Sequence, residues 1–265
     1  QELTSAPFVT AAEPEVDLDD DVVHPPDPPA RSLFDALAGT LPTATLSTSY
    51  RARDDRLVGL QARIAGRGGL LAMPTVRGST PLLHERVDAD PAGEEPLDST
   101  RAEVDRVVEL ILEHARIRPH QSLGVVTLGR RHAGRIDDAL RRALVRSPDA
   151  ARFIREDREE PFFVKDVEQA VGDVRDAVIL SVGYGRSVDG RVRYRFGLLD
   201  RPGGDRLLTA TIAAAREQLT VVSGFGADDL NPRRLITPGA QALRGVLADA
   251  SSTDLMGEGE PADDA

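Results

Sequence analysis

The chain of 265 residues has no cysteine and no tryptophan, and aromatic residues make up only 4% of it. The absence of cysteine excludes disulfide bonds, zinc sites with thiolate ligands, iron–sulfur clusters and a cysteine nucleophile. No run approaches the roughly 18 apolar residues that span a bilayer. The N-terminus is acidic and lacks the basic and apolar regions of a signal peptide, so we expect a cytoplasmic protein that does not contact a membrane.

Lysine is also nearly absent, because Lys165 is the only lysine among the 33 basic residues. A Walker A loop ends in Gly-Lys followed by Ser or Thr, and its lysine binds the β- and γ-phosphates of a nucleotide. Lys165 stands in the sequence Phe-Val-Lys-Asp, with no glycine before it. The chain therefore cannot form a complete P-loop nucleotide site by itself.

Other common site motifs are missing as well. None of the five histidines has the His-x-x-x-His spacing that places two imidazoles on one helix face, so we expect surface or core histidines and no metal site. Gly183-Tyr-Gly185 and Gly224-Phe-Gly226 lack the third glycine of a dinucleotide fingerprint and are predicted to be turns after strands. No Gly-x-Ser-x-Gly sequence marks a hydrolase nucleophile.

The net charge of −11 is concentrated at the two ends of the sequence. Residues 1–30 carry eight acidic and no basic residues, and residues 251–265 carry five acidic and no basic residues. Residues 31–250 are left with a net charge of +2. We therefore predict an acidic, proline-rich segment over 1–31 and a disordered acidic tail over 251–265. The nearly neutral body neither indicates nor excludes nucleic acid as a partner.

Between these ends, short apolar runs alternate with amphipathic helical patterns, which predicts a three-layer α/β sandwich with a mostly parallel sheet. Thr100 and Glu103 fit a capping box at the start of the clearest helix. We assign 98–250 to the core of the domain and 32–97 to an inter-domain linker and the start of the domain. The predicted strands cover 45–51, 81–87, 123–128, 162–164, 176–182 and 219–223. The predicted helices cover 32–38, 54–65, 100–115, 131–145, 207–216 and 238–248.

Four segments in this order carry a resemblance to a known family, namely 32–51 with its Tyr50-Arg51, Ser122–His132, Val167–Ser181 and Arg206–Ser223. They are similar to the stretch ending in motif IIIa and to motifs IV, V and VI of superfamily I helicases of the Upf/Dna type. The resemblance covers about residues 32–250 and is to the C-terminal RecA-like domain, above all of large bacterial members. It implies a RecA-like α/β fold, related to P-loop NTPases but without a P-loop.

In such helicases ATP and Mg²⁺ are bound between two RecA-like domains, and the first domain supplies the Walker loop and the acidic metal site. The resemblance implies that Tyr50 stacks on the base and that Arg51 reaches the γ-phosphate. It places Gly172 and Asp173 on the nucleotide side, and Arg216 matches the second arginine of motif VI. An N-terminal RecA-like domain, in a longer chain or a separate protein, is the implied partner.

The resemblance also implies contacts with single-stranded nucleic acid for Arg130, Arg131, Lys165 and Ser181. Ordinary alternatives stay open for all four residues. The two arginines also fit a solvated start of a helix, and Lys165 and Ser181 also fit ordinary ends of strands. Tyr50 could likewise be an interface aromatic, and Arg51 a surface ion-pair residue.

Several positions depart from the family pattern. Val171 and Val174 replace the glutamine and glutamate of motif V, and Ala213-Ala214 replaces the Thr-Arg pair of motif VI, which includes the arginine finger. Because the finger neutralises charge on the γ-phosphoryl group, we expect a helicase-like ATPase half that is inactive alone. The alternatives are a non-catalytic RecA-like module that docks a protein or nucleic acid, and the product of a decaying gene.

Overall fold

The computed structural model describes residues 37–66, 70–72, 81–88, 98–155, 158–187 and 189–257. From Leu46 onward the chain forms one compact unit, and the residues before it belong to a separate unit. The acidic segment at 1–31, most of the predicted helix at 32–38 and the end of the tail lie outside the described residues.

A five-stranded sheet with the order β3-β7-β6-β4-β5 forms the centre of the compact unit. All four strand pairs in this sheet are parallel, as predicted. Its strands are β3 (Leu82–Arg86), β4 (Leu123–Thr127), β5 (Phe163–Asp166), β6 (Arg175–Ser181) and β7 (Ala215–Ser223). A separate parallel pair joins β1 (Thr48–Ser49) to β2 (Leu71–Ala72).

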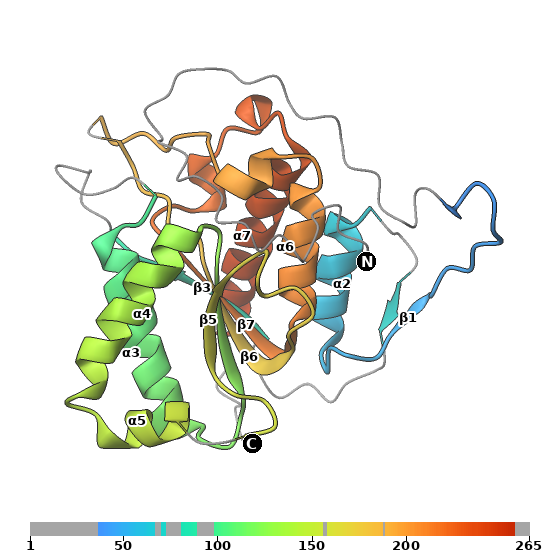
Figure 1. Cartoon of the computed structure of the whole chain (residues 1–265). Coiled ribbons are helices and arrows are strands. Elements are labelled where there is room, and N and C mark those ends of the chain that lie inside the picture. The colour runs from blue at the N-terminus through green and yellow to red at the C-terminus, as the bar shows by residue number, and fades with distance from the viewer. Residues whose placement is uncertain are drawn as a thin grey trace, which may run out of the picture. The chain divides into compact units, whose positions relative to one another are not determined.

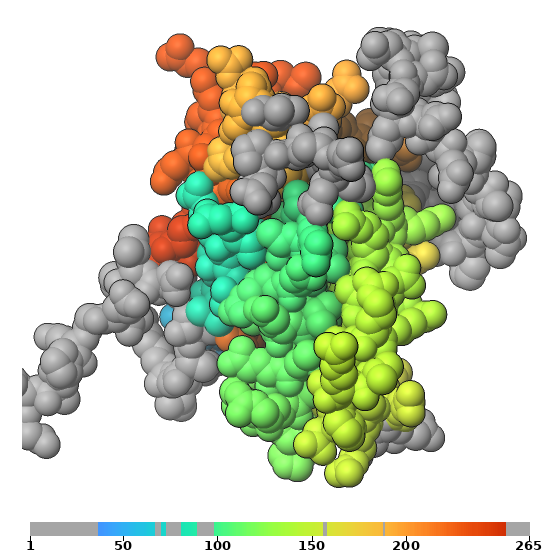
Figure 2. Space-filling model, turned by 90° about the vertical axis from the view of Figure 1, so that its left-hand side faces the viewer, coloured from blue at the N-terminus to red at the C-terminus, as the bar shows by residue number. Residues whose placement is uncertain are grey.

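Helices cover both faces of the sheet and complete the predicted three-layer α/β sandwich (Figure 1). One face carries α3 (Arg101–Ile117), α4 (Arg130–Leu144) and α5 (Pro148–Arg155). The other carries α2 (Asp55–Ile64), α6 (Gly204–Ala213) and α7 (Pro238–Gly257). Short 3₁₀ turns are η1 (Gly197–Asp200), η2 (Ala227–Asp229) and η3 (Pro232–Arg234). Figure 2 shows α3 and α4 side by side on the outer surface of their layer.

The apolar runs form the central strands because both faces of these strands are covered. All five residues of β4 are buried, and Val125 packs with Ile111 of α3 and Ile136 of α4 in one cluster without exposed surface. Burying each such side chain contributes about 1.5–3 kcal/mol. Gly124 is required at its position, because a Cβ atom there would lie 2.5 Å from the ring of Phe163.

Since the strands of the main sheet are parallel, all of them begin at one edge and end at the opposite edge. We call these the amino edge and the carboxyl edge. Ser122, Arg175 and Ala215 lie at the amino edge, whereas Ser181 and Ser223 end their strands at the carboxyl edge. The candidate functional residues divide between these two edges.

Two predicted element boundaries are wrong. The helix predicted over 238–248 continues to Gly257, into the predicted tail. The helix predicted over 207–216 ends at Ala213, and β7 already begins at Ala215, so Arg216 lies on a strand. Arg175 pairs with Ala215, and its backbone N–H donates to the carbonyl of Ala214 at 2.9 Å. Pairing with β6 thus outweighs the helix propensity of the alanine run. The short helix α5 was not predicted.

The predicted capping box is also wrong. Thr100 is the N-cap of α3, but its hydroxyl makes no capping bond. The carboxylate of Glu103 turns into the interior and accepts hydrogen bonds from the backbone N–H groups of Gly183 at 2.7 Å and Gly224 at 3.1 Å. Glu103 therefore connects α3 to the turns after β6 and β7. Among the described residues, no helix has the length and apolar character needed to cross a membrane.

Candidate functional site

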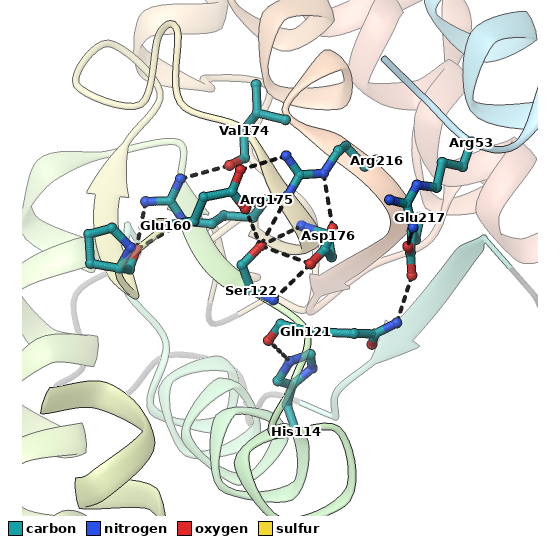
Figure 3. A network of polar contacts seen from close by, with 11 residues as sticks. Arg53, His114, Gln121, Ser122, Glu160, Val174, Arg175, Asp176, Arg216 and Glu217 are labelled. Carbon is teal, nitrogen blue, oxygen red and sulfur yellow. Dashed lines mark hydrogen bonds and ion pairs between the residues drawn. The ribbon is translucent and has the colours of Figure 1, made fainter. Parts of the chain in front are cut away.

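Arg216 is the centre of a polar network at the amino edge, which Figure 3 shows from close by. Its guanidinium donates to Oε1 of Glu160 at 2.6 Å and to Oδ1 of Asp176 at 2.9 Å. A second guanidinium nitrogen contacts the other carboxylate oxygen of Glu160. The arginine is thus held by two carboxylates, one of them in bidentate geometry, which is the strongest arrangement for such a pair.

The charges in this network stabilise one another. Hydrogen bonds from Arg216 lower the pKa of Glu160, and the bonds to Glu160 raise the pKa of Arg216. Burial opposes ionisation of Asp176, but the backbone N–H of Ser122 and the guanidinium of Arg216 outweigh it, so the pKa of Asp176 is also lowered. All three side chains remain partly exposed, with 24% exposure for Arg216. The network is therefore charged near neutral pH and accessible from solvent.

Ser122 holds the two acidic residues in place from the start of β4. Its hydroxyl donates to Glu160 at 2.6 Å, and its backbone N–H donates to Oδ2 of Asp176 at 3.0 Å. The backbone N–H of Asp176 in turn donates to the Ser122 hydroxyl at 2.9 Å. These bonds fix the carboxylates around Arg216 without using the arginine itself.

Arg175 contributes no free positive charge to the amino edge. It is buried, and its guanidinium donates to the carbonyls of Pro161 and Val174 and stacks over the ring of Phe163. Val174 is the residue that the resemblance aligns with the motif V glutamate. In this structure that position supplies a backbone carbonyl to the neighbouring arginine.

The segment containing Tyr50 and Arg51 lies beside Arg216. The backbone N–H of Arg53 donates to the carbonyl of Arg216 at 2.6 Å, and the Arg53 side chain pairs with Glu217. Tyr50 is 79% exposed, and Arg51 is exposed. The structure therefore places the residues just after Tyr50 and Arg51 beside the start of β7, and it leaves the two side chains that the resemblance assigns to the nucleotide accessible to solvent.

Gly172 and Asp173 lie in the turn that leads into β6. Gly172 has a φ of +94°, which glycine adopts without steric cost. Asp173 pairs with Lys165 at 2.5 Å, and the Lys165 ammonium lies 4.9 Å from the centre of the Phe163 ring. Lys165 and Asp173 thus form a pair within the domain.

The two alanines at the motif VI position are packed against the sheet. Ala214 is 3% exposed, and its carbonyl is bonded to β6. Ala213 ends α6 and is half-buried. Alanine cannot bind a phosphate, so Arg216 is the arginine of this segment that lies at the amino edge.

Arg130 and Arg131 lie on the opposite side of the domain, at the carboxyl edge, where α4 begins. Arg130 is 70% exposed and lies 3.4 Å from Asp166, and Arg131 is 59% exposed and lies 3.6 Å from Asp98. Arg131 forms a loose surface pair, which holds a side chain weakly, whereas the Asp166 carboxylate beside Arg130 is buried. Both arginines remain accessible to an external anion.

The expectation that Ser181 faces a nucleic-acid strand is wrong. Ser181 is fully buried, and its hydroxyl lies 2.7 Å from Nε2 of His132 and 3.1 Å from Oε2 of Glu103. Nδ1 of His132 lies 2.8 Å from the hydroxyl of Ser99. Burial raises the pKa of Glu103 to about 7 and lowers that of His132 to about 3. We call Ser99, Glu103, His132 and Ser181 the buried polar cluster.

Sequence reasoning did not identify Ser122, Glu160 or Glu217 as partners of the arginines. Ser122 and Glu217 lie inside two of the motif-like segments, but the resemblance assigns no role to them, and only the fold brings these residues together. The one available signal was indirect, because Ser122 and Glu160 each lie just before a predicted strand. In a parallel sheet such positions gather at the same edge.

Comparison with known proteins finds relatives among helicases, and no family model matches the chain. The Uncharacterized ATP-dependent helicase MG140 of Mycoplasma genitalium is 26% identical over 158 residues, which cover 57% of this chain. Its homolog in Mycoplasma pneumoniae is 35% identical over 69 residues, or 26% of this chain. The chain spans only 13% and 6% of the length of these two relatives.

A solved structure, the C-terminal domain of a possible DNA helicase from Lactobacillus plantarum, is 20% identical with a TM-score of 0.39. That match covers 71% of this chain and 93% of the other. The two sequence matches confirm the helicase relationship that the order of motif-like segments predicted. The chain is thus a helicase-like α/β domain, related in sequence to ATP-dependent helicases over more than half of its length.

Proposed function

We propose that this chain is the C-terminal RecA-like half of a superfamily I helicase-like ATPase. Its amino edge supplies one wall of an ATP cleft, and the domain supplies part of a path for single-stranded nucleic acid. The observation that carries the proposal is the bond between Arg53 N–H and the Arg216 carbonyl. This bond holds the residues just after the motif IIIa-like segment beside the motif VI-like strand at one accessible edge.

The residues present fit one wall of a nucleotide site and no more. Tyr50 offers an exposed aromatic face for a base, and Arg51 offers an exposed guanidinium for a phosphate. The Walker lysine and the acidic metal ligands have to come from an N-terminal RecA-like domain. ATP and Mg²⁺ are therefore ligands of the pair of domains, and the chain on its own is inactive.

Two features make turnover weak even with that partner. Ala214 replaces the arginine finger, whose loss costs roughly 10³–10⁵ in rate. Arg216 is already neutralised by Glu160 and Asp176. A γ-phosphoryl group would have to compete with two carboxylates for this guanidinium. Arg130, Arg131 and Lys165 are the side chains that we assign to the nucleic-acid path.

The test uses the native polypeptide that contains this sequence together with its N-terminal RecA-like partner. We expect saturable binding of a non-hydrolysable ATP analogue and a hydrolysis rate far below that of active helicases. Arg51→Ala should weaken analogue binding, whereas Arg142→Ala on the exposed end of α4 should not. Robust ATP turnover stimulated by nucleic acid would refute the claim that the site is weak. Analogue binding that is unchanged by Arg51→Ala would refute the claim that the amino edge forms one wall of the ATP cleft.

The alternative function is a non-catalytic RecA-like module that docks a protein or nucleic acid. The internal neutralisation of Arg216 favours it, because a surface selected for phosphate binding has no need of two competing carboxylates. This alternative predicts no affinity for the ATP analogue even in the presence of the partner. Analogue binding that depends on Arg51 separates the two functions.

A further inference from the structure

An arginine-rich surface lies beyond the carboxyl edge and belongs to none of the helicase-like motifs. It consists of Arg193, Tyr194, Arg195, Arg233 and Arg234, which we call the Tyr194 patch. The first three follow β6, and the last two belong to η3, so the fold brings together two distant segments. Residues 190–196 and 230–237 hold five arginines and no acidic residue.

Tyr194 connects the two segments of the patch. Its hydroxyl accepts a hydrogen bond from the backbone N–H of Asn231 at 2.9 Å. The guanidinium of Arg234 stacks over its ring, 4.0 Å from the ring centre. The side chain of Asn231 also caps η3 by accepting from the backbone N–H of Arg233 at 3.0 Å. The patch is thus ordered by contacts of Tyr194 and Asn231, in which the only guanidinium involved is that of Arg234.

The side chains of the patch point outward for a packing reason. Val192 and Phe196 are buried, with 6% and 0% exposure, and they anchor the segment to the core. Arg193 and Arg195 alternate with them along the chain and are exposed. Arg233 and Arg234 are exposed as well.

Ion pairing separates this patch from the other arginines of the carboxyl edge. Arg130 and Arg131 each have a carboxylate partner, and Asp229 pairs with both Arg86 and Arg186. Within the described part of the chain, the four arginines of the patch form no ion pair. Their combined charge therefore favours an anion from outside the domain.

We propose that the Tyr194 patch binds single-stranded nucleic acid, with its arginines on the phosphates and a base stacked on the Arg234–Tyr194 pair. A guanidinium binds phosphate in bidentate geometry, and a guanidinium held flat on an aromatic ring presents a planar face to a base. Charged groups combined with a stacking platform are the usual means of binding single strands. An acidic peptide would pair with the arginine charges but would leave the face of the Arg234 guanidinium without a stacking partner.

This inference rests on the nucleic-acid part of the proposed function and not on the ATP cleft. It adds a contact that is independent of Arg130, Arg131 and Lys165. Its distinguishing claim is that Arg234 acts through its plane as well as through its charge.

The experiment measures anisotropy of a labelled oligothymidylate of about 20 nucleotides with the full chain. Arg193→Ala combined with Arg233→Ala should weaken binding about tenfold. It should also reduce the slope of log K against log salt by about 1.4, because each phosphate contact on a single strand contributes about 0.7. The control combines Arg63→Ala with Arg141→Ala, which removes the same charge from exposed arginines paired with Asp249 and Asp137. It should change affinity less than about twofold.

A second arm tests the stacked plane with Arg234→Lys, which keeps the charge. This variant should weaken binding of the oligothymidylate severalfold and leave binding of inorganic polyphosphate, which has no bases, unchanged. Equal losses for both ligands, or displacement of the oligothymidylate by polyglutamate at equal charge, would overturn the proposal.

The outcomes distinguish this inference from the proposed function. Loss of binding with Arg130→Ala and Arg131→Ala, but not with the patch variants, would overturn the patch and leave the proposed path intact. The absence of any binding by the wild-type chain would overturn both nucleic-acid assignments. Each variant is checked for an unchanged thermal unfolding midpoint, so that a loss of affinity reports on binding.

Discussion

Nε2 of His132 lies 2.7 Å from the hydroxyl oxygen of Ser181. The Ser181 hydroxyl has one hydrogen and two neighbouring acceptors, because Oε2 of Glu103 lies 3.1 Å away on its other side. When Glu103 is ionised, Ser181 donates to it and His132 must carry its proton on Nε2. When Glu103 is protonated, Ser181 is free to donate to a His132 that carries its proton on Nδ1. The tautomer of His132 therefore follows the protonation state of Glu103.

Glu103→Gln should change the way stability depends on pH. The pKa of Glu103 is about 7 in the folded chain and 4.5 as the ordinary value, so the folded state binds more protons between these pH values. The contribution of Glu103 to the stability of the wild type is therefore fully present below about pH 4.5 and is lost as the pH rises to about 7. We expect the difference in unfolding free energy between wild type and variant to fall by about 3 kcal/mol over this range.

The measurement is urea unfolding at a series of pH values. Glu113→Gln, on the exposed side of the same helix, is the matched control. Its unfolding free energy should depend on pH in the same way as that of the wild type. A difference between wild type and Glu103→Gln that stays constant from pH 4.5 to 7 would contradict the prediction.

For His132→Gln, the difference in unfolding free energy from wild type should change with pH in the opposite direction. The pKa of His132 is lowered from 6.5 to about 3 by burial, so the unfolded chain binds the extra proton between these values. The stability that this neutral histidine retains is lost as the pH falls from about 6.5 toward 3. The advantage of wild type over His132→Gln should therefore shrink on acidification, whereas the advantage over Glu103→Gln should grow. Slopes of the same sign in the two variants would show that these groups do not titrate as described.

Gly183→Ala should destabilise the domain more than Gly190→Ala. Both glycines have positive φ, +82° and +74°, so alanine is strained at either position. At Gly183 a Cβ atom would also lie 2.9 Å from the ring of His132 and 3.1 Å from the carbonyl of Asp98, whereas at Gly190 it would meet nothing within 4 Å. We expect a loss of about 1 kcal/mol at Gly190 and at least about 2 kcal/mol at Gly183. Thermal unfolding measures both losses. Equal losses would show that His132 and its neighbours in the buried polar cluster can move to make room for the added methyl group.

Glu160→Gln should increase the affinity of the amino edge for polyanions. The substitution removes one of the two charges that neutralise Arg216, while Asp176 still holds the guanidinium through its Nε atom. We expect tripolyphosphate to bind severalfold more tightly, as measured by calorimetry. Glu159→Gln, an exposed neighbour with the same charge change, should have no effect. The gain should disappear when Arg216→Ala is added, and a gain that persists would place the anion elsewhere.

The layers of the fold could be predicted from the sequence because strands that are buried on both faces consist of apolar residues. The runs at 123–128 and 176–182 are apolar because both faces of these strands are covered, and each became a central strand. The roles of Tyr50 and Arg51 stay predictions, and the structure adds that Arg53, two residues further on, bonds to the start of β7.

The errors arose where a distant contact decides the local structure. Arg216 lies on a strand because β6 pairs with its segment, although the alanine run favours a helix. Glu103 has the spacing of a capping residue, yet its carboxylate serves two turns that lie about 80 and 120 residues further along the chain. The Tyr194 patch was missed because its two segments show no periodic pattern. The contacts between them include the hydrogen bond from Asn231 N–H to the Tyr194 hydroxyl and the stacking of Arg234 on the Tyr194 ring.

The seven residues of β6 separate the two edges of the sheet. At about 3.3 Å per residue, the two ends of this strand lie about 20 Å apart, with Arg216 at the amino edge and the exposed Arg130 and Arg131 at the carboxyl edge. That separation is more than twice the Debye length of about 8 Å at physiological ionic strength. Solvent-exposed charges at one edge are therefore screened from those at the other. A salt series that follows the exposed charges at one edge can therefore be interpreted separately from the exposed charges at the other edge.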